Sequence, residues 1–80
     1  MSKAIPLTQN NSALVDDEDY DRLKSYQWFL SGPGYAAGFA PVDGRFKLTY
    51  MHRLILNASP DQLVDHINGN TLDNRRQNLR

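Results

Sequence analysis

The sequence predicts a single α+β domain in which an N-terminal helix and a small antiparallel sheet precede a turn-rich C-terminal segment. Its 80 residues suffice for one hydrophobic core and no more. A hydrophobic fraction of 40%, with eight aromatic residues, is enough to fold that core and too rich for a disordered chain. No internal repeat or low-complexity linker divides the chain, so we expect residues 1–80 to form one domain.

The N-terminal part predicts a loop followed by a helix. Residues 1–12 are polar and loop-like, apart from Ile5 and Leu7, which could form a short edge strand. The acidic cluster 16–19 then predicts a helix that runs to about Tyr26, because a carboxylate at the first position accepts free backbone N–H groups and suits the positive end of the helix dipole. A helix start explains the acidic cluster better than a metal site does.

The middle of the chain predicts three short strands. Residues 28–30 form the first, which the turn sequence Ser-Gly-Pro-Gly at 31–34 ends. Residues 35–40 and 46–50 form a pair, because the link between them contains Asp43-Gly44, a dipeptide favoured in hairpin turns.

The last thirty residues predict a helix, a strand and a tight turn. Residues 51–58 place their apolar side chains on one helical face, and residues 63–67 form a strand that ends in a turn at 68–70. The final stretch, 72–80, has too few apolar residues to close a core. We therefore divide the domain into a supporting segment, 1–50, and a site-bearing segment, 51–80.

Charge and composition limit the class of protein. Residues 1–44 carry three Lys or Arg against six Asp or Glu, whereas residues 45–80 carry six against three, so a net charge of zero hides halves of −3 and +3. A basic half is a hint of a polyanionic partner. The chain has no cysteine, which excludes disulfides, thiolate zinc sites and a cysteine nucleophile. No apolar run approaches the ~20 residues of a membrane span and the N-terminus has no secretion signal, so we expect a cytoplasmic protein without a membrane partner.

The dipeptide Asp65-His66 is the best candidate for chemistry. It lies at the end of a predicted strand, where side chains can reach a site. An imidazole held by one ring nitrogen can take a proton from water with the other, and a carboxylate is a hard ligand for a divalent cation. Together these are the parts that phosphodiester hydrolysis requires. By itself, however, an Asp-His pair in a turn is more often structural.

Three ordered segments give this pair a context. They are Met51-His52-Arg53-Leu54-Ile55, the run 64–70 (VDHINGN) and the run 72–80 (LDNRRQNLR). In content and spacing they closely resemble the HNH family of homing-type and phage-encoded endonucleases. The resemblance is strong over 51–80 and moderate upstream. It implies that the site-bearing segment forms the first part of a ββα-metal motif, with the N-terminal helix and the sheet as its support.

The resemblance also implies roles for three residues. His66 corresponds to the general base that acts on the attacking water, and Asp65 corresponds to the ligand of the catalytic divalent cation, Mg²⁺ or Mn²⁺. Asn78 corresponds to the asparagine that braces the loop of the histidine. The implied activity is metal-dependent hydrolysis of DNA phosphodiester bonds in a bacterial or phage-infected cell.

Further positive side chains are candidates for DNA binding. Arg75, Arg76 and Arg80 flank the base histidine, where the DNA backbone would pass. His52 and Arg53 could face a phosphate or could pack as amphipathic cover, and the sequence leaves both interpretations open.

Two alternatives remain open at this level. The family's last motif residue, a His or Asn on a helix after a second strand, has no counterpart before Arg80. We therefore expect the 80 residues alone to cleave little, and the site to be completed if the chain continues beyond them. The alternative function is a non-catalytic DNA-binding or protein-interaction module that keeps the nuclease shape. A homo-oligomer that covers Leu72 and Leu79 is a further expectation.

Overall fold

The computed structural model of the protein describes all residues 1–80, and strands rather than helices dominate it. Five strands form two antiparallel sheets, one of two strands in the order β1-β2 and one of three strands in the order β3-β4-β5. The strands are β1 (Ser2–Pro6), β2 (Ser12–Asp16), β3 (Trp28–Leu30), β4 (Ala36–Val42) and β5 (Arg45–Tyr50). Two short helices, α1 (Asp17–Leu23) and α2 (Met51–Leu56), and the 3₁₀ turn η1 (Arg76–Asn78) complete the fold. Neither helix is long and apolar enough to cross a lipid bilayer.

The prediction of an N-terminal helix that leads into a ββα motif is wrong. The chain begins with the β1–β2 hairpin, in which Ile5 pairs with Ala13 and Lys3 pairs with Val15. Alternation explains this hairpin, because Ala13 and Val15 are fully buried while the residues between and beside them are more exposed. The turn is made by Gln9 and Asn10, both with φ of 60°.

Helix α1 follows β2 directly and is shorter than predicted. It starts at the acidic cluster, but the Asp16 carboxylate does not cap it and instead accepts a hydrogen bond from the backbone N–H of Arg76 at 3.1 Å. The helix ends at Leu23, whose carbonyl oxygen accepts a hydrogen bond from the indole N–H of Trp28 at 2.9 Å. The aromatic side chain therefore fixes the path from α1 into β3.

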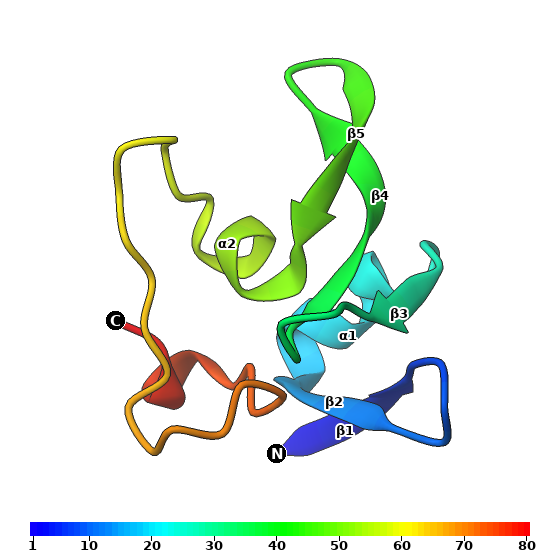
Figure 1. Cartoon of the computed structure of the whole chain (residues 1–80), viewed down its shortest axis with the longest axis vertical. Coiled ribbons are helices and arrows are strands. Elements are labelled where there is room, and N and C mark those ends of the chain that lie inside the picture. Colours follow the sequence, from blue (N-terminus) through cyan, green and yellow to red (C-terminus); the bar gives the residue numbers. More distant parts are fainter.

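The β4–β5 hairpin confirms the predicted Asp-Gly turn. Val42 pairs with Arg45, and the two residues between them, Asp43 and Gly44, have φ of 53° and 79°. Positive φ at both positions is the requirement of a tight two-residue hairpin turn. The hairpin projects from the body of the molecule, with its turn at the top of Figure 1.

The predicted strand 63–67 and the full predicted helix 51–58 do not form. Helix α2 ends at Leu56, because Asn57 adopts the left-handed conformation with φ of 52°. Beyond it, the chain is irregular apart from η1 and single bridges that pair His66 with Leu79 and Leu14 with Asp73. No second strand of alternating apolar residues is available for the segment 63–67 to pair with, so turns take its place.

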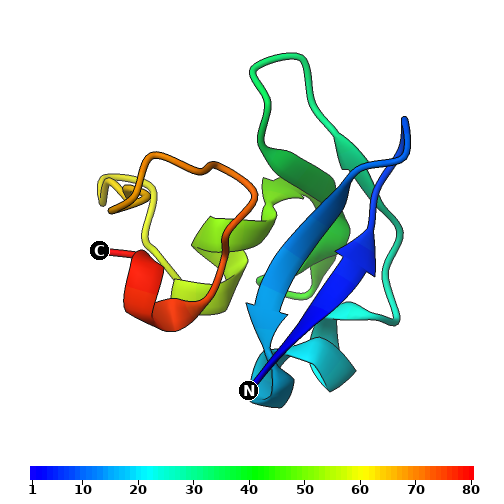
Figure 2. The ribbon, with the colours of Figure 1, turned by 90° about the horizontal axis from the view of Figure 1, so that it is seen from below.

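The core joins both sheets, both helices and the C-terminal segment. Its ten buried hydrophobic residues are Ile5, Ala13, Val15, Leu23, Trp28, Ala36, Ala40, Met51, Ile55 and Leu79. Leu72 packs against the rim of this core. The expectation that Leu72 and Leu79 offer an exposed edge to another copy therefore does not fit the structure. Figure 2 shows the C-terminal segment (orange to red) on one side of α2, with β1 and β2 (blue) on the other.

Candidate functional site

The C-terminal segment folds as a loop whose two ends are held together by the backbone. Asp65 and Arg80 exchange two hydrogen bonds, of 2.8 Å and 3.1 Å, and the N–H of Ile67 donates to the carbonyl of Asn78 at 2.8 Å. At its far side the loop is fixed to β2, because the N–H of Leu14 donates to Leu72 and the N–H of Asn74 donates to Leu14. The loop is thus anchored at both sides although it contains no regular strand.

Asn78 holds the interior of this loop. Its Oδ1 accepts a hydrogen bond from the backbone N–H of Asn68 at 3.0 Å, and its Nδ2 donates to Asn68 Oδ1 at 3.0 Å and to the Asp73 carbonyl at 2.9 Å. The side chain is buried, so these bonds have no competition from water. Asn78 therefore fixes the turn that follows His66, which is the geometry of a bracing residue.

Asp73 is a second buried anchor, one for which the sequence analysis assigned no role. Arg75 donates two hydrogen bonds of 2.7 Å to its carboxylate, and Asn68 donates a third of 3.0 Å. The hydrogen bonds from Arg75 are the largest cause of a lowered pKa of Asp73, while burial opposes them. The ion pair between Arg75 and Asp73 thus closes the loop around Asn68 and Asn78.

The His66 ring is buried and held by one nitrogen. Its Nε2 lies 2.7 Å from Oδ1 of Asn74, a fully buried residue. With the Asn74 amide in this orientation its oxygen accepts from Nε2–H, and in the neutral ring the lone pair then lies on Nδ1. Nδ1 has no hydrogen-bond partner in the chain and is not fully enclosed, although the residue as a whole is only 6% exposed. This is the tautomer and the exposure that a general base needs.

Aromatic rings form the wall behind His66. The centroid of the His52 ring lies 4.9 Å from that of His66, and the ring of Tyr35 lies 5.9 Å from His66 and 5.2 Å from His52. Tyr50 stacks on His52 at 5.7 Å. These contacts restrict the rotation of the His66 ring, so both imidazoles have fixed positions.

His52 is a neutral member of this cluster. Burial, followed by the nearby His66 and Arg53, lowers the pKa of His52 to about 4. The ring atom Nδ1 of His52 and the amide Nδ2 of Asn74 are buried without a hydrogen-bond partner. Such atoms reduce stability unless an ordered water molecule pairs with them.

Asp65 lies next to His66 in sequence but in a different environment. Its side chain is 70% exposed, and Oδ1 accepts a hydrogen bond from the backbone N–H of His66 at 2.9 Å. Arg80 approaches the other oxygen at 3.6 Å. The carboxylate is therefore open to solvent and to a cation, and it is tied to the histidine through the backbone.

The residues around Asp65 fit a magnesium-type ion only in part. An exposed carboxylate is one suitable oxygen ligand, and Mg²⁺ commonly keeps several waters and binds substrate phosphate in addition. The one group of three acidic or histidine ligands that converge in the fold is Asp16, Glu18 and Asp19, and it does not include Asp65. Asp65 is thus a single-carboxylate site.

The predicted DNA-binding arginines are largely occupied within the chain. Arg75 is paired with Asp73, and Arg76 donates hydrogen bonds of 2.8 Å and 2.9 Å to the buried Asp19. Arg53 donates to the carbonyls of Ser59 and Gln62 at 2.6 Å and 2.7 Å. Only Arg80 remains mostly exposed, with its weak contact to Asp65.

Asn74, Asp73 and Tyr35 belong to this site, and no role in it was predicted for them from the sequence. One sequence feature points to Asn74 and Asp73: the density of Asn and Asp between positions 65 and 78, which is typical of a loop held by side-chain hydrogen bonds.

The chain was compared with protein-family models, with curated proteins and with solved structures, and it matches none of them. The residues of the site therefore carry the functional argument.

Proposed function

We propose that the chain provides the catalytic histidine and the metal ligand of an HNH-type endonuclease that hydrolyses DNA phosphodiester bonds with a divalent cation. The observation that carries this proposal is the state of His66: a buried ring, bound through Nε2, with Nδ1 free and reachable. An enzyme of this kind would act in the cytoplasm of a bacterial or phage-infected cell.

In the proposed reaction His66 is the general base. Its Nδ1 takes the proton of a water molecule, the water oxygen attacks phosphorus, and the bond from phosphorus to the 3′-oxygen breaks. The leaving oxygen takes a proton from solvent. In the neutral ring, the hydrogen bond from Nε2–H to Asn74 leaves the lone pair on Nδ1, and a positioned base of this type contributes on the order of 10²–10⁴ in rate.

Asp65 is the proposed metal ligand, and Asn78 a positioning residue. A divalent cation on the Asp65 carboxylate would stabilise the negative charge that develops on the phosphate and the leaving oxygen. Asp65 and the base are adjacent in sequence, and the Asp65 carboxylate is anchored by a hydrogen bond from the backbone N–H of His66. Asn78 maintains the turn behind them through its three hydrogen bonds.

One observation favours the second candidate, a non-catalytic nucleic-acid-binding module. No further carboxylate or histidine joins Asp65 in a cluster of three ligands. A cation held by one carboxylate binds weakly, so the chain would cleave slowly even if the proposed chemistry is correct. The test must therefore detect a low rate.

The test is a nicking assay on supercoiled plasmid with Mg²⁺ or Mn²⁺, run with wild type and His66→Ala. We expect slow conversion to the nicked form that chelator abolishes, and a loss of about 100-fold or more in His66→Ala. Lys24→Gln, which changes an exposed residue paired with Asp21, is the control and should cleave as wild type does. If His66→Ala cleaves the plasmid as fast as wild type does, the mechanism is overturned. If wild type binds DNA but shows no metal-dependent cleavage, the result supports the non-catalytic module instead.

A further inference from the structure

The positive side chains divide into those that an acid of the chain neutralises and those that none does. Five are paired: Arg22, Lys24, Arg75, Arg76 and Arg80. Lys3 lies over the ring of Tyr20, at 4.9 Å from its centroid. The remaining three, Arg45, Lys47 and Arg53, are paired with no carboxylate. These are the side chains whose charge no carboxylate offsets, although the guanidinium of Arg53 also donates to the carbonyls of Ser59 and Gln62. Arg80 is exposed as well, 3.6 Å from the exposed Asp65.

All three lie on neighbouring elements. Arg45 and Lys47 are two residues apart on β5, so their side chains point to the same face of the hairpin, and Arg53 lies on α2, which follows β5 directly. Both β5 residues are exposed. Strand β5 is also an edge of its sheet, so no further strand covers this side.

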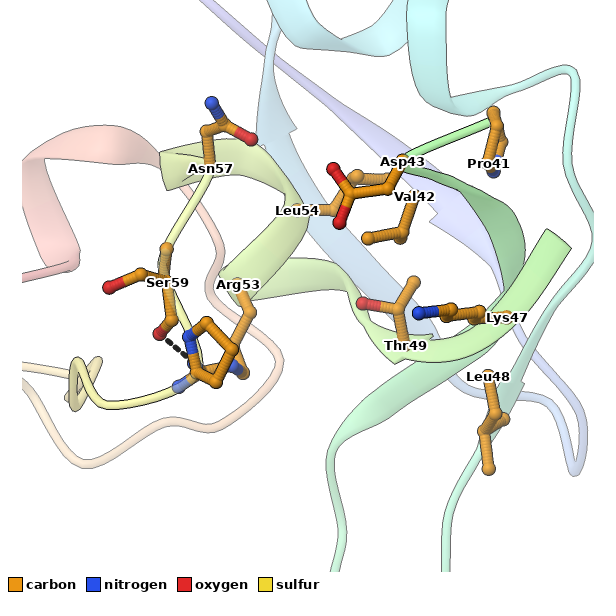
Figure 3. A pocket seen from close by; sticks show the side chains of 12 residues that line it. Pro41, Val42, Asp43, Lys47, Leu48, Thr49, Arg53, Leu54, Asn57 and Ser59 are labelled. Carbon is orange, nitrogen blue, oxygen red and sulfur yellow. Dashed lines mark hydrogen bonds between the residues drawn. The ribbon is translucent and has the colours of Figure 1, made fainter. Parts of the chain in front are cut away.

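Between the hairpin and α2 lies an open groove of about 600 Å³ (Figure 3). Its polar lining includes Lys47, Thr49, Arg53, Asn57 and Ser59. These cationic, hydroxyl and amide groups are of the kinds that contact phosphate oxygens in nucleic-acid complexes. Asp43, at the turn of the hairpin, is the single acidic residue of the lining.

We propose that this groove, together with Arg45 at its rim, binds the phosphate backbone of duplex DNA. The inference rests on the proposed function for the identity of the polyanion, and on the unpaired charges for its location. It places the DNA contact on β5 and α2 and not on Arg75 and Arg76, whose charges are already neutralised by buried carboxylates. Lys47 and Arg45 supply the charge, while Arg53 both adds charge and holds the wall of the groove through its bonds to Ser59 and Gln62.

The groove and the histidine cluster are connected through the first turn of α2. His52, which packs against His66, is followed by Arg53, which lines the groove. A backbone bound along β5 and α2 would therefore pass beside the element that supports the base. Three cations that are spread over β5 and α2 suit a repeating row of phosphates better than one phosphate group, and for this reason duplex DNA is the occupant we infer.

Fluorescence anisotropy with a labelled duplex oligonucleotide, without divalent metal, tests the proposal. The double variant R45Q/K47Q should lose at least about tenfold in affinity near 100 mM salt, and the slope of log affinity against log salt should fall by roughly two, one for each lost phosphate contact. The matched control K3Q/K24Q removes the same net charge from the region around Tyr20 and should change affinity less than about twofold. Arg53 is left intact because its loss would also release the loop.

The outcomes separate this proposal from the proposed function. Equal DNA affinity in wild type, R45Q/K47Q and K3Q/K24Q overturns the groove, whatever the plasmid assay shows. Equal losses in both double variants also overturn it, because net charge alone then explains binding. If R45Q/K47Q changes the mass of the chain in solution and leaves DNA affinity unchanged, the face is a contact between copies and the proposal fails. His66→Ala should bind DNA as wild type does, so failure of catalysis leaves the groove standing.

Discussion

The two regions of the molecule are stabilised by different means. Residues 1–56 are built from two sheets and two helices whose backbone groups pair in regular ladders over buried small and apolar side chains. Residues 57–80 contain one 3₁₀ turn, two single bridges and scattered backbone bonds, and Asn and Asp side chains add hydrogen bonds to backbone groups that no ladder pairs. The proposed base and metal ligand both lie in the second region.

The site depends on the identity of particular side chains, whereas the scaffold depends only on the pattern of polar and apolar residues along its strands and helices. A ladder tolerates many residues of the same polarity, because the backbone makes its bonds. A loop held by Asn78, Asp73 and Asn74 tolerates few, because each replaced side chain leaves buried partners unpaired. Three predictions test this difference, from the largest expected effect to the smallest.

Gly38→Ala should disrupt the first region, residues 1–56, and give the largest loss in the free energy of unfolding. A Cβ at Gly38 would lie 2.5 Å from the carbonyl oxygen of Gln27 and 2.8 Å from Cε3 of Trp28, and a backbone atom cannot move away without displacing β3. We expect the free energy of unfolding to fall by about 3 kcal/mol or more. Denaturant unfolding followed by the fluorescence of Trp28, the single tryptophan, measures it.

Gly32→Ala is the matched control, since nothing lies within 4 Å of a Cβ at that position. Its effect should stay within about 0.5 kcal/mol. If Gly38→Ala is as stable as Gly32→Ala, the close approach of β4 to the path from α1 into β3 is not a constraint on the scaffold.

Asn78→Ala should loosen the second region and leave the first in place. The change removes three hydrogen bonds and leaves the Asn68 N–H and the Asp73 carbonyl without partners, which should cost roughly 2–3 kcal/mol. Hydrogen exchange should accelerate at Ile67 and Asn68, with the β4–β5 amides unchanged. Asn70→Ala, which removes only the exposed hydrogen bond from the Leu72 N–H to Asn70 Oδ1, should have a smaller effect. Equal acceleration along β4 and β5 would contradict the division into two regions.

The sequence predicts the scaffold best where local geometry decides it. The Asp43-Gly44 turn and its two strands follow from a dipeptide that is favoured where both turn positions have positive φ. The strand Ser12–Asp16 was not predicted, because its alternation is short and adjoins an acidic helix start, whereas a short edge strand was already expected at Ile5. Its partner strand carries a single buried residue, Ile5.

The site was less predictable, because distant residues build it. The order of Asp65, His66 and Asn78 was available from the motif, whereas the contact of Asn74 with His66 depends on how the loop closes. The sequence left open whether His52 faces a phosphate or packs, and the structure buries it beside Tyr35 and Tyr50. The pairing of Arg76 with Asp19, 57 residues away, has no local signal at all.

The smallest expected effect is a pH dependence that originates where the two regions meet. Burial, His66 and Arg53 lower the pKa of His52 from 6.5 to about 4, so the unfolded chain binds a proton that the folded chain does not between these values. Stability should therefore be complete above pH 6.5 and should fall as the pH drops toward 4. We expect a loss of roughly 1–2 kcal/mol, since partial access of solvent to the ring reduces the full effect of the shift.

His52→Phe isolates this contribution. The phenyl ring can keep the stacking on Tyr50 and Tyr35 but cannot take up a proton, so the difference in unfolding free energy between wild type and variant should change with pH only between 6.5 and 4. The Asp73 carboxyl, whose pKa lies below its usual 3.8, contributes at lower pH and does not overlap this window. If the difference in unfolding free energy between wild type and His52→Phe stays constant across that pH range, His52 takes up its proton in the folded chain at no cost in stability. The ring would then be open to water, and the wall behind His66 would not restrict the base.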